Sequence, residues 1–452
     1  MNQFKPIVVL LFMTISTTCF SQSEIDKILR EISTAPSAER IENDIKTLVN
    51  FGTRHTLSDT VSNLRGIGAA RRWIKSTFEN ISEKCNNCLE VSYLGDLVKA
   101  DGRRIVTDTK VVNVMAIQRG TKYPNHFVIM SGDIDSRVSN PNNFTANSPG
   151  ANDNASGMAG TIEAARVLSN YKFPVSVIYV GLSGEEQGLY GGKIMAKFAK
   201  KNNWNIIAVL NNDMIGNIEG IDGVIDNSSF RVFSEAISMK TSEKEQKSMR
   251  FYGGEVDGPS RQLARYIDKL TDLYMTNLDA IMIYRLDRFG RGGHHRPFND
   301  EGFTGVRIME THENYTRQHQ DIRVENGVKY GDVIEGVNFE YAAKLTAVNS
   351  LTLASLASAP LAPEKVMIAG AVQPSTRLKW DTVDNENLIG YKIYWRDTTS
   401  PVWQYSRFVG TVTDYTLKNR VIDNFLFGVA SVGKNGAESL IQFPRKLIPK
   451  GM

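Results

Sequence analysis

Apolar residues in the first part of the chain recur at the spacing of α-helices. Two runs, from Ile25 to Ile32 and from Ile41 to Val49, place them three or four positions apart, so they share one face of a helix. We therefore expect residues 22 to about 80 to be mainly helical. Arg54 and His55 interrupt the pattern, and we interpret them as a structural loop.

From Val111 onward the pattern changes to short apolar runs separated by amphipathic segments. The sequence predicts a helix from Ala155 to about Ser169 and strands at residues 127–130, 175–180, 206–210, 280–284 and 306–309. Strands that alternate with helices indicate a mostly parallel sheet with helices on both faces. The predicted fold class is therefore α/β.

A helix from about Phe339 to Leu356 ends this pattern, and a linker that contains Ala, Ser and Pro follows at residues 357–362. The remaining residues, 363–452, contain only short runs with strand character, which predicts an all-β sandwich. The first domain then covers residues 22–356.

The C-terminal sandwich resembles a fibronectin type III domain. Trp380 stands where that family has a buried Trp, whereas Phe425 stands where it usually has a corner Tyr. Sandwich domains at the end of an enzyme are commonly spacers or adhesion modules that contact a polymer or a cell surface, so we expect no part of the sandwich in the chemistry.

The N-terminus differs from the rest of the chain. Lys5 precedes an apolar run from Ile7 to Ile15, and the small residues Cys19 and Ser21 precede a cleavage position. This order is typical of a secretory signal peptide, so residues 1–21 are expected to be removed and the protein to be secreted or periplasmic. A lipid anchor on Cys19 is the less favoured alternative.

Composition narrows the classes of partner. The 452 residues are 41% hydrophobic, with 53 Lys and Arg against 49 Asp and Glu, which is ordinary for a globular protein. No basic run is present, which argues against nucleic acid as a partner. No stretch after the signal approaches the roughly 18 apolar residues of a membrane span.

Cys85 and Cys88 remain after cleavage, and an even pair in an exported chain predicts a disulfide.

Five segments place acidic or imidazole side chains just after predicted strands, which is where open α/β sheets bind ligands. They are residues 131–136, 149–157, 183–188, 211–214 and 315–321. Each segment alone is weak evidence, because an Asp before a helix is commonly a cap.

Together, in this order, the five segments resemble the secreted M28-type zinc aminopeptidases over roughly residues 40 to 355. The resemblance implies two divalent metal ions, zinc being preferred, and peptide substrates. The family's bridging Asp falls on Asp153, its general base on Glu185, and its further metal ligands on Glu186, Asp213 and His319, with His312 as the fallback for His319. It also implies a cis peptide bond after Asp153.

The chemistry of a two-metal site explains why these residue types are expected at these positions. A bridging carboxylate can hold two ions about 3.5 to 4 Å apart, and a water between them ionises near neutral pH. Glu185 would then take its proton, a task that requires an acid not itself bound to metal. Glu186 and His319 would complete the shell of the first ion.

Asp133 departs from the family pattern, which has a metal-binding His there. The second ion would then be held by Asp133, Asp153 and Asp213, an all-carboxylate shell that favours Mn, Mg or Ca more than the usual shell does. Alternatively the second ion is weak or missing, or His294, which stands where the family has Asp, donates the imidazole. His295 matches the family's next His.

The sequence therefore favours an exported metallo-aminopeptidase that hydrolyses the N-terminal residues of peptides. Two alternatives stay open: a glutaminyl-cyclase-like transferase with a single zinc, and a non-catalytic binding protein.

Overall fold

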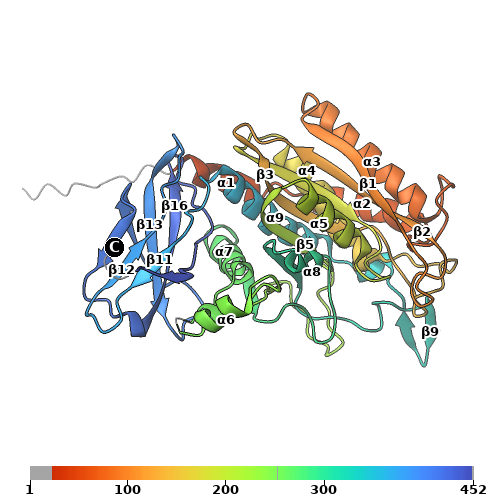
Figure 1. Ribbon diagram of the computed structural model, residues 1–452. Coiled ribbons are helices and arrows are strands. Elements are labelled where there is room, and N and C mark those ends of the chain that lie inside the picture. The colour runs from red at the N-terminus through yellow and green to blue at the C-terminus, as the bar shows by residue number, and fades with distance from the viewer. Residues whose placement is uncertain (1–22, 252, 450–452) are drawn as a thin grey trace, which may run out of the picture.

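The computed structural model describes residues 23–251 and 253–449, so the predicted signal peptide, residues 1–21, lies outside the described residues. Figure 1 shows a large α/β domain joined to a smaller β domain. In the α/β domain the helices are α1 (Glu24–Ser33), α2 (Ala38–Asn50), α3 (Gly66–Lys84), α4 (Gly157–Leu168), α5 (Tyr190–Lys201), α6 (Glu243–Met249), α7 (Pro259–Tyr274), α8 (His295–Asp300) and α9 (Phe339–Ser358).

One eight-stranded sheet runs through this domain, in the order β1-β2-β4-β3-β5-β8-β6-β7. Its strands are β1 (Leu89–Val98), β2 (Thr109–Gln118), β3 (Tyr123–Asp133), β4 (Val175–Leu182), β5 (Asn205–Asn212), β6 (Ser229–Phe233), β7 (Asp279–Ile283) and β8 (Gly305–Glu310). The central strands β4, β3, β5 and β8 are mutually parallel, which confirms the predicted fold class. A separate hairpin pairs β9 (Arg323–Glu325) with β10 (Val328–Tyr330).

Both faces of the central strands are buried, because successive side chains of a strand pack into two different cores. On β3, Val128 and Met130 belong to the core under α4 and α9, whereas Phe127 and Ile129 belong to the opposite core with Met195 of α5. Successive residues of a strand point to opposite faces, so apolar runs such as that of β3 are covered twice. This explains why the sequence showed continuous apolar runs there.

The strand at residues 89–98 was not predicted from the sequence, for a physical reason. β1 is the edge strand of the sheet, and most of its residues are exposed or partly exposed. Its apolar residues are too sparse to predict a buried strand. The nearby disulfide between Cys85 and Cys88 is present as predicted.

The C-terminal domain consists of two sheets around one core. A four-stranded sheet has the order β15-β12-β11-β17, and a three-stranded sheet has the order β14-β13-β16. The strands are β11 (Met367–Ala369), β12 (Thr376–Lys379), β13 (Leu388–Asp397), β14 (Tyr405–Gly410), β15 (Asp414–Leu417), β16 (Phe425–Gly433) and β17 (Lys446–Leu447). Trp380 is buried in that core, where its ring lies 5.3 Å from the ring of Tyr391.

Polar contacts fix the two domains to each other. Asp257, before α7, bonds to Arg265 of α7 and to Arg396 of β13, and all three side chains are buried. The helix α9 continues to Ser358, inside the predicted linker. Among the described residues, no helix is both long and apolar enough to cross a bilayer.

Candidate metal centre

The predicted site residues converge at one edge of the sheet. Asp133 is the last residue of β3, Asp213 follows β5 directly, and Glu185 and Glu186 come just after β4. His319 lies in the loop after β8. Because β3, β4, β5 and β8 are parallel, their carboxyl ends meet at this edge, as the sequence predicted.

Three of the five predicted metal ligands form a compact group. Asp153, Glu186 and His319 each offer a ligand atom within 4.8 Å of the others. Nε2 of His319 lies 2.8 Å from Oδ2 of Asp153 and 2.9 Å from Oε1 of Glu186. Apart from this contact with His319, Oε1 of Glu186 is buried without a hydrogen-bond partner. One imidazole and two carboxylates, one of which has an oxygen without a hydrogen-bond partner, are a set of ligands that fits a zinc ion.

The electrostatics of this group keep its two carboxylates ionised. Burial opposes ionisation of Asp153, but His319 and the guanidinium of Arg288 outweigh it and hold the pKa of Asp153 below its usual range. Burial likewise opposes ionisation of Glu186, yet His319 lowers the pKa of its carboxyl. Both carboxylates are therefore charged at neutral pH.

The turn that carries Asp153 is held by a second carboxylate. Asp332 accepts the backbone N–H of Asn152 at 2.8 Å and that of Asp153 at 2.7 Å. The peptide bond between Asp153 and Asn154 is cis, as predicted, and that between Asp213 and Met214 is also cis. His319, another ligand, has φ +55°, a left-handed conformation that non-glycine residues adopt mainly where surrounding contacts hold them.

Asp135 positions the adjacent pair Glu185 and Glu186. Its carboxylate accepts the backbone N–H groups of Glu185 at 3.2 Å and Glu186 at 3.1 Å. Glu185 does not belong to the three-ligand group. Burial, followed by repulsion from Asp213 and Glu186, raises the pKa of Glu185 well above its usual range. A carboxyl group with a raised pKa beside a metal site is suited to proton transfer.

The other two predicted ligands, Asp133 and Asp213, are not in the group. Oδ2 of Asp213 lies 2.9 Å from Nη2 of Arg307. Oδ1 of Asp133 lies 2.5 Å from Nδ1 of His294, and its Oδ2 accepts a hydrogen bond from Asn154. No second group of three metal-binding side chains forms within the part of the chain that the structure describes.

The remaining histidines have other partners. His312, the fallback ligand, lies 3.1 Å from Asp222 and away from the group. His295 is buried, and its Nε2 lies 2.8 Å from the backbone oxygen of Leu286. Burial lowers the pKa of His294 to about 4, so its imidazole is neutral at pH 7.

Sequence reasoning missed two arginines at this site. Arg137 places Nε 2.7 Å from Glu186 and Nη2 2.6 Å from His319, so it contacts two ligands of the group. Arg307 is fully buried within β8. A charged residue between the apolar residues Val306 and Ile308 of a strand was a usable signal for Arg307, because Arg is almost never fully buried without a partner.

Comparisons with known proteins agree with this geometry. The profile of peptidase family M28 matches residues 113–326. A "probable zinc metalloprotease" of Pyrenophora tritici-repentis is 37% identical over 426 residues, which cover 93% of this chain and 98% of that protein. One of Leptosphaeria maculans is 39% identical over 424 residues, covering 94% and 97%. The match therefore extends into the C-terminal domain.

A solved structure shares the fold. The LapA aminopeptidase of Legionella pneumophila superposes with a TM-score of 0.52 at 18% identity, over 74% of this chain and 75% of that one.

Proposed function

Because this chain belongs to peptidase family M28 and is a zinc metalloprotease, we propose that it is an exported aminopeptidase that removes N-terminal residues from peptides. The observation that carries the proposal is the group of Asp153, Glu186 and His319 with Glu185 directly beside it in the chain. These three side chains would hold a zinc ion, which would supply a Lewis acid to polarise the scissile carbonyl and acidify water.

The residues of this chain divide the remaining work. Glu185 is not among the three ligands, so its carboxylate is free to take a proton from the attacking water and pass it to the leaving amine. Asp135 holds the backbone that carries Glu185 and Glu186 by accepting both of their N–H groups. Arg137 orients Glu186 and His319 from outside the group.

Two parts of the proposal rest on sequence. The restriction to N-terminal residues follows from the order of the five segments, which resembles that of aminopeptidases. Export follows from the signal-like residues 1–21, and the disulfide between Cys85 and Cys88 suits an oxidising compartment. N-terminal sequencing of the protein collected outside the cell tests export, with Gln22 as the expected first residue.

A panel of amino-acid anilides, each with a free or an acetylated amino group, tests the activity. We expect turnover of the free forms, loss of turnover with a chelator, and recovery with zinc. Equal cleavage of the acetylated forms would indicate an endopeptidase. Cyclisation of glutaminyl peptides without hydrolysis would favour the single-zinc transferase, and no turnover by the zinc-loaded protein would favour a binding protein.

A further inference from the structure

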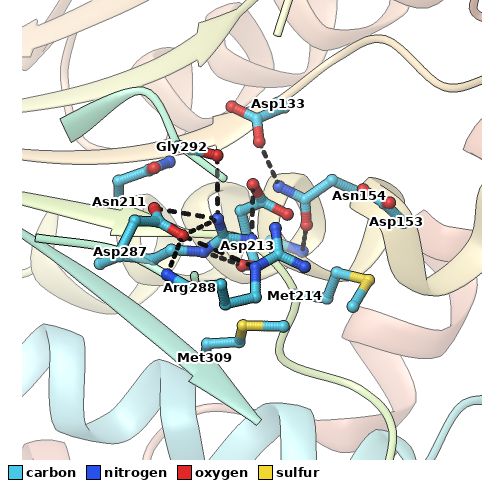
Figure 2. Close-up of polar contacts among 12 residues, drawn as sticks. Asp133, Asp153, Asn154, Asn211, Asp213, Met214, Asp287, Arg288, Gly292 and Met309 are labelled. Atoms are coloured by element: carbon cyan, nitrogen blue, oxygen red, sulfur yellow. Dashed lines mark hydrogen bonds and ion pairs between the residues drawn. The ribbon is translucent and has the colours of Figure 1, made fainter. Parts of the chain in front are cut away.

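The carboxylates predicted to hold a second ion are already bonded to groups of this chain. Arg307 contacts Asp213 at two points. Nη2 of Arg307 lies 2.9 Å from Oδ2 of Asp213, and Nε of Arg307 donates a hydrogen bond to the backbone oxygen of Asp213. Asp133 is bonded through one oxygen to His294 and through the other to Asn154. Figure 2 shows Asp133 and Asn154 joined beside Asp213.

Arg307 is fixed in this position from its far side. Its Nη1 donates to both carboxylate oxygens of Asp287, at 3.0 and 3.1 Å, and to the backbone oxygen of Gly292 at 3.1 Å. A side chain at Gly293 would place Cβ 2.9 Å from Oδ1 of Asn211 and 3.3 Å from Nη1 of Arg307. The loop thus packs directly on the guanidinium, and the side chain of Arg307 is fully buried.

A second cation, largely but not fully buried, strengthens the positive charge there. Arg288 lies beside Asp213 in Figure 2, with Nη1 2.8 Å from Glu313 and Nε 3.6 Å from Asp287. Like charges repel strongly where water is excluded. A divalent ion at Asp213 would meet two guanidinium groups, and only one of its predicted ligands, Asp153, belongs to a metal-binding group.

We propose that the Arg307 guanidinium takes the place of the second metal ion, so the protein binds one zinc ion per chain. The inference rests on the zinc site of the proposed function, at Asp153, Glu186 and His319. Arg307 then acts as a positioning residue: held by Asp287, it fixes the carboxylate of Asp213 and supplies the positive charge on that side of the site.

Zinc stoichiometry tests this directly. The full-length mature protein is stripped with a chelator, titrated with zinc, desalted and measured by elemental analysis and native mass spectrometry. We expect one tightly bound equivalent in the wild type, one in Asp213→Ala, and none in Asp153→Ala. Two equivalents in the wild type, or loss of one of two in Asp213→Ala, would overturn the inference. A wild type that binds no zinc would instead overturn the proposed function.

A variant designed to bind a second zinc ion provides an independent test of the inference. The double variant Asp133→His with Arg307→Met restores an imidazole and removes the guanidinium, so it should bind a second equivalent of zinc. Arg396→Met removes another buried arginine, paired with Asp257 at the domain interface, and should stay at one equivalent. A folded double variant that still binds one equivalent would show that the guanidinium is not what excludes the ion. If the double variant does not fold, the zinc stoichiometries of the wild type and of Asp213→Ala still test the inference.

Discussion

Nδ1 of His294 lies 2.5 Å from Oδ1 of Asp133, and both side chains are buried. These are two positions at which the sequence departs from the aminopeptidase pattern, one with Asp for His and the other with His for Asp. Their contact explains why the departures occur together, because each group would be left without a partner in the interior if only one had changed. Because burial lowers the pKa of His294, its imidazole is neutral and lies within hydrogen-bond distance of the Asp133 carboxyl group.

A reciprocal exchange should therefore be tolerated better than either single change. Asp133→His places two imidazoles in contact, and His294→Asp places two carboxyl groups in contact, so each should lower the free energy of unfolding by roughly 2 kcal/mol or more. The double variant should recover much of this loss, with a coupling energy of about 1 to 3 kcal/mol. Denaturant unfolding of the four proteins measures the cycle, and additive losses would contradict a direct bond.

Glu185→Gln should leave zinc content unchanged and lower turnover by a factor of about 100 or more, which is the usual contribution of a positioned base. The reason is that Glu185 lies outside the three-ligand group. Glu186→Gln is the matched control, since it removes a ligand and should lower zinc content as well. Loss of zinc from Glu185→Gln would reverse the roles assigned to the two neighbours.

Arg137→Ala should weaken zinc binding while preserving its stoichiometry at saturation. Arg137 contacts Glu186 and His319 together, and groups that orient metal ligands from outside commonly change affinity by 10- to 100-fold. Competition with a chromogenic chelator measures the dissociation constant. The zinc affinity of Arg137→Lys should lie between those of the wild type and Arg137→Ala. A lysine keeps the positive charge, but it cannot contact both ligands at once as the two nitrogens of the guanidinium do. An unchanged affinity in Arg137→Ala would contradict the orienting role.

Arg54 should prove structural, as its place in the sequence suggested. It is fully buried and donates hydrogen bonds to the backbone oxygens of Ile134, Gly150, Leu48 and Pro149. It therefore ties helix α2 to the end of β3 and to the segment that leads to the metal ligand Asp153. Arg54→Met leaves buried carbonyls without donors and should lower the free energy of unfolding by about 3 kcal/mol or more.

Arg72 offers the matched comparison for Arg54. It also donates to three backbone oxygens, of Thr60, Val61 and Ser62, but in an exposed position. Water can replace these bonds, so Arg72→Met should change the unfolding free energy by only a few tenths to about 1 kcal/mol. Equal losses in the two variants would mean that burial is not what makes Arg54 important.

The sequence was sufficient for features that depend on local pattern. Buried parallel strands appear as apolar runs, and residues at or just after the ends of such strands, including Asp133 and Glu186, were placed correctly at one edge of the sheet because parallel strands end together. The partners of those residues are non-local. His294 and Asp133 are 161 positions apart and Arg307 and Asp213 are 94 apart, so no spacing rule could have paired them.

Glu438 lies at the contact between the two domains. Glu438 of the β domain receives Lys269 of α7 at 2.8 Å, Lys392 of β13 at 2.9 Å and the hydroxyl of Tyr394. Burial opposes its ionisation, but the two lysines prevail and lower the pKa of Glu438 from 4.5 to about 2. A depressed pKa means that the stabilisation is complete above pH 4.5 and is lost as the pH falls toward 2.

Glu438→Gln should therefore lower the free energy of unfolding by up to about 3 kcal/mol at pH 7, at 1.36 kcal/mol per pKa unit. The difference from wild type should shrink steadily between pH 4.5 and pH 2. Denaturant unfolding at pH 7, 5, 4 and 3 measures it. Asp381→Asn breaks an exposed ion pair with Lys365 in the same domain and should shift the unfolding midpoint little, since exposed pairs contribute little. A Glu438→Gln deficit that stays constant from pH 7 to pH 3 would mean that the ionised carboxylate is not the stabilising group, because a lost packing contact would not depend on pH.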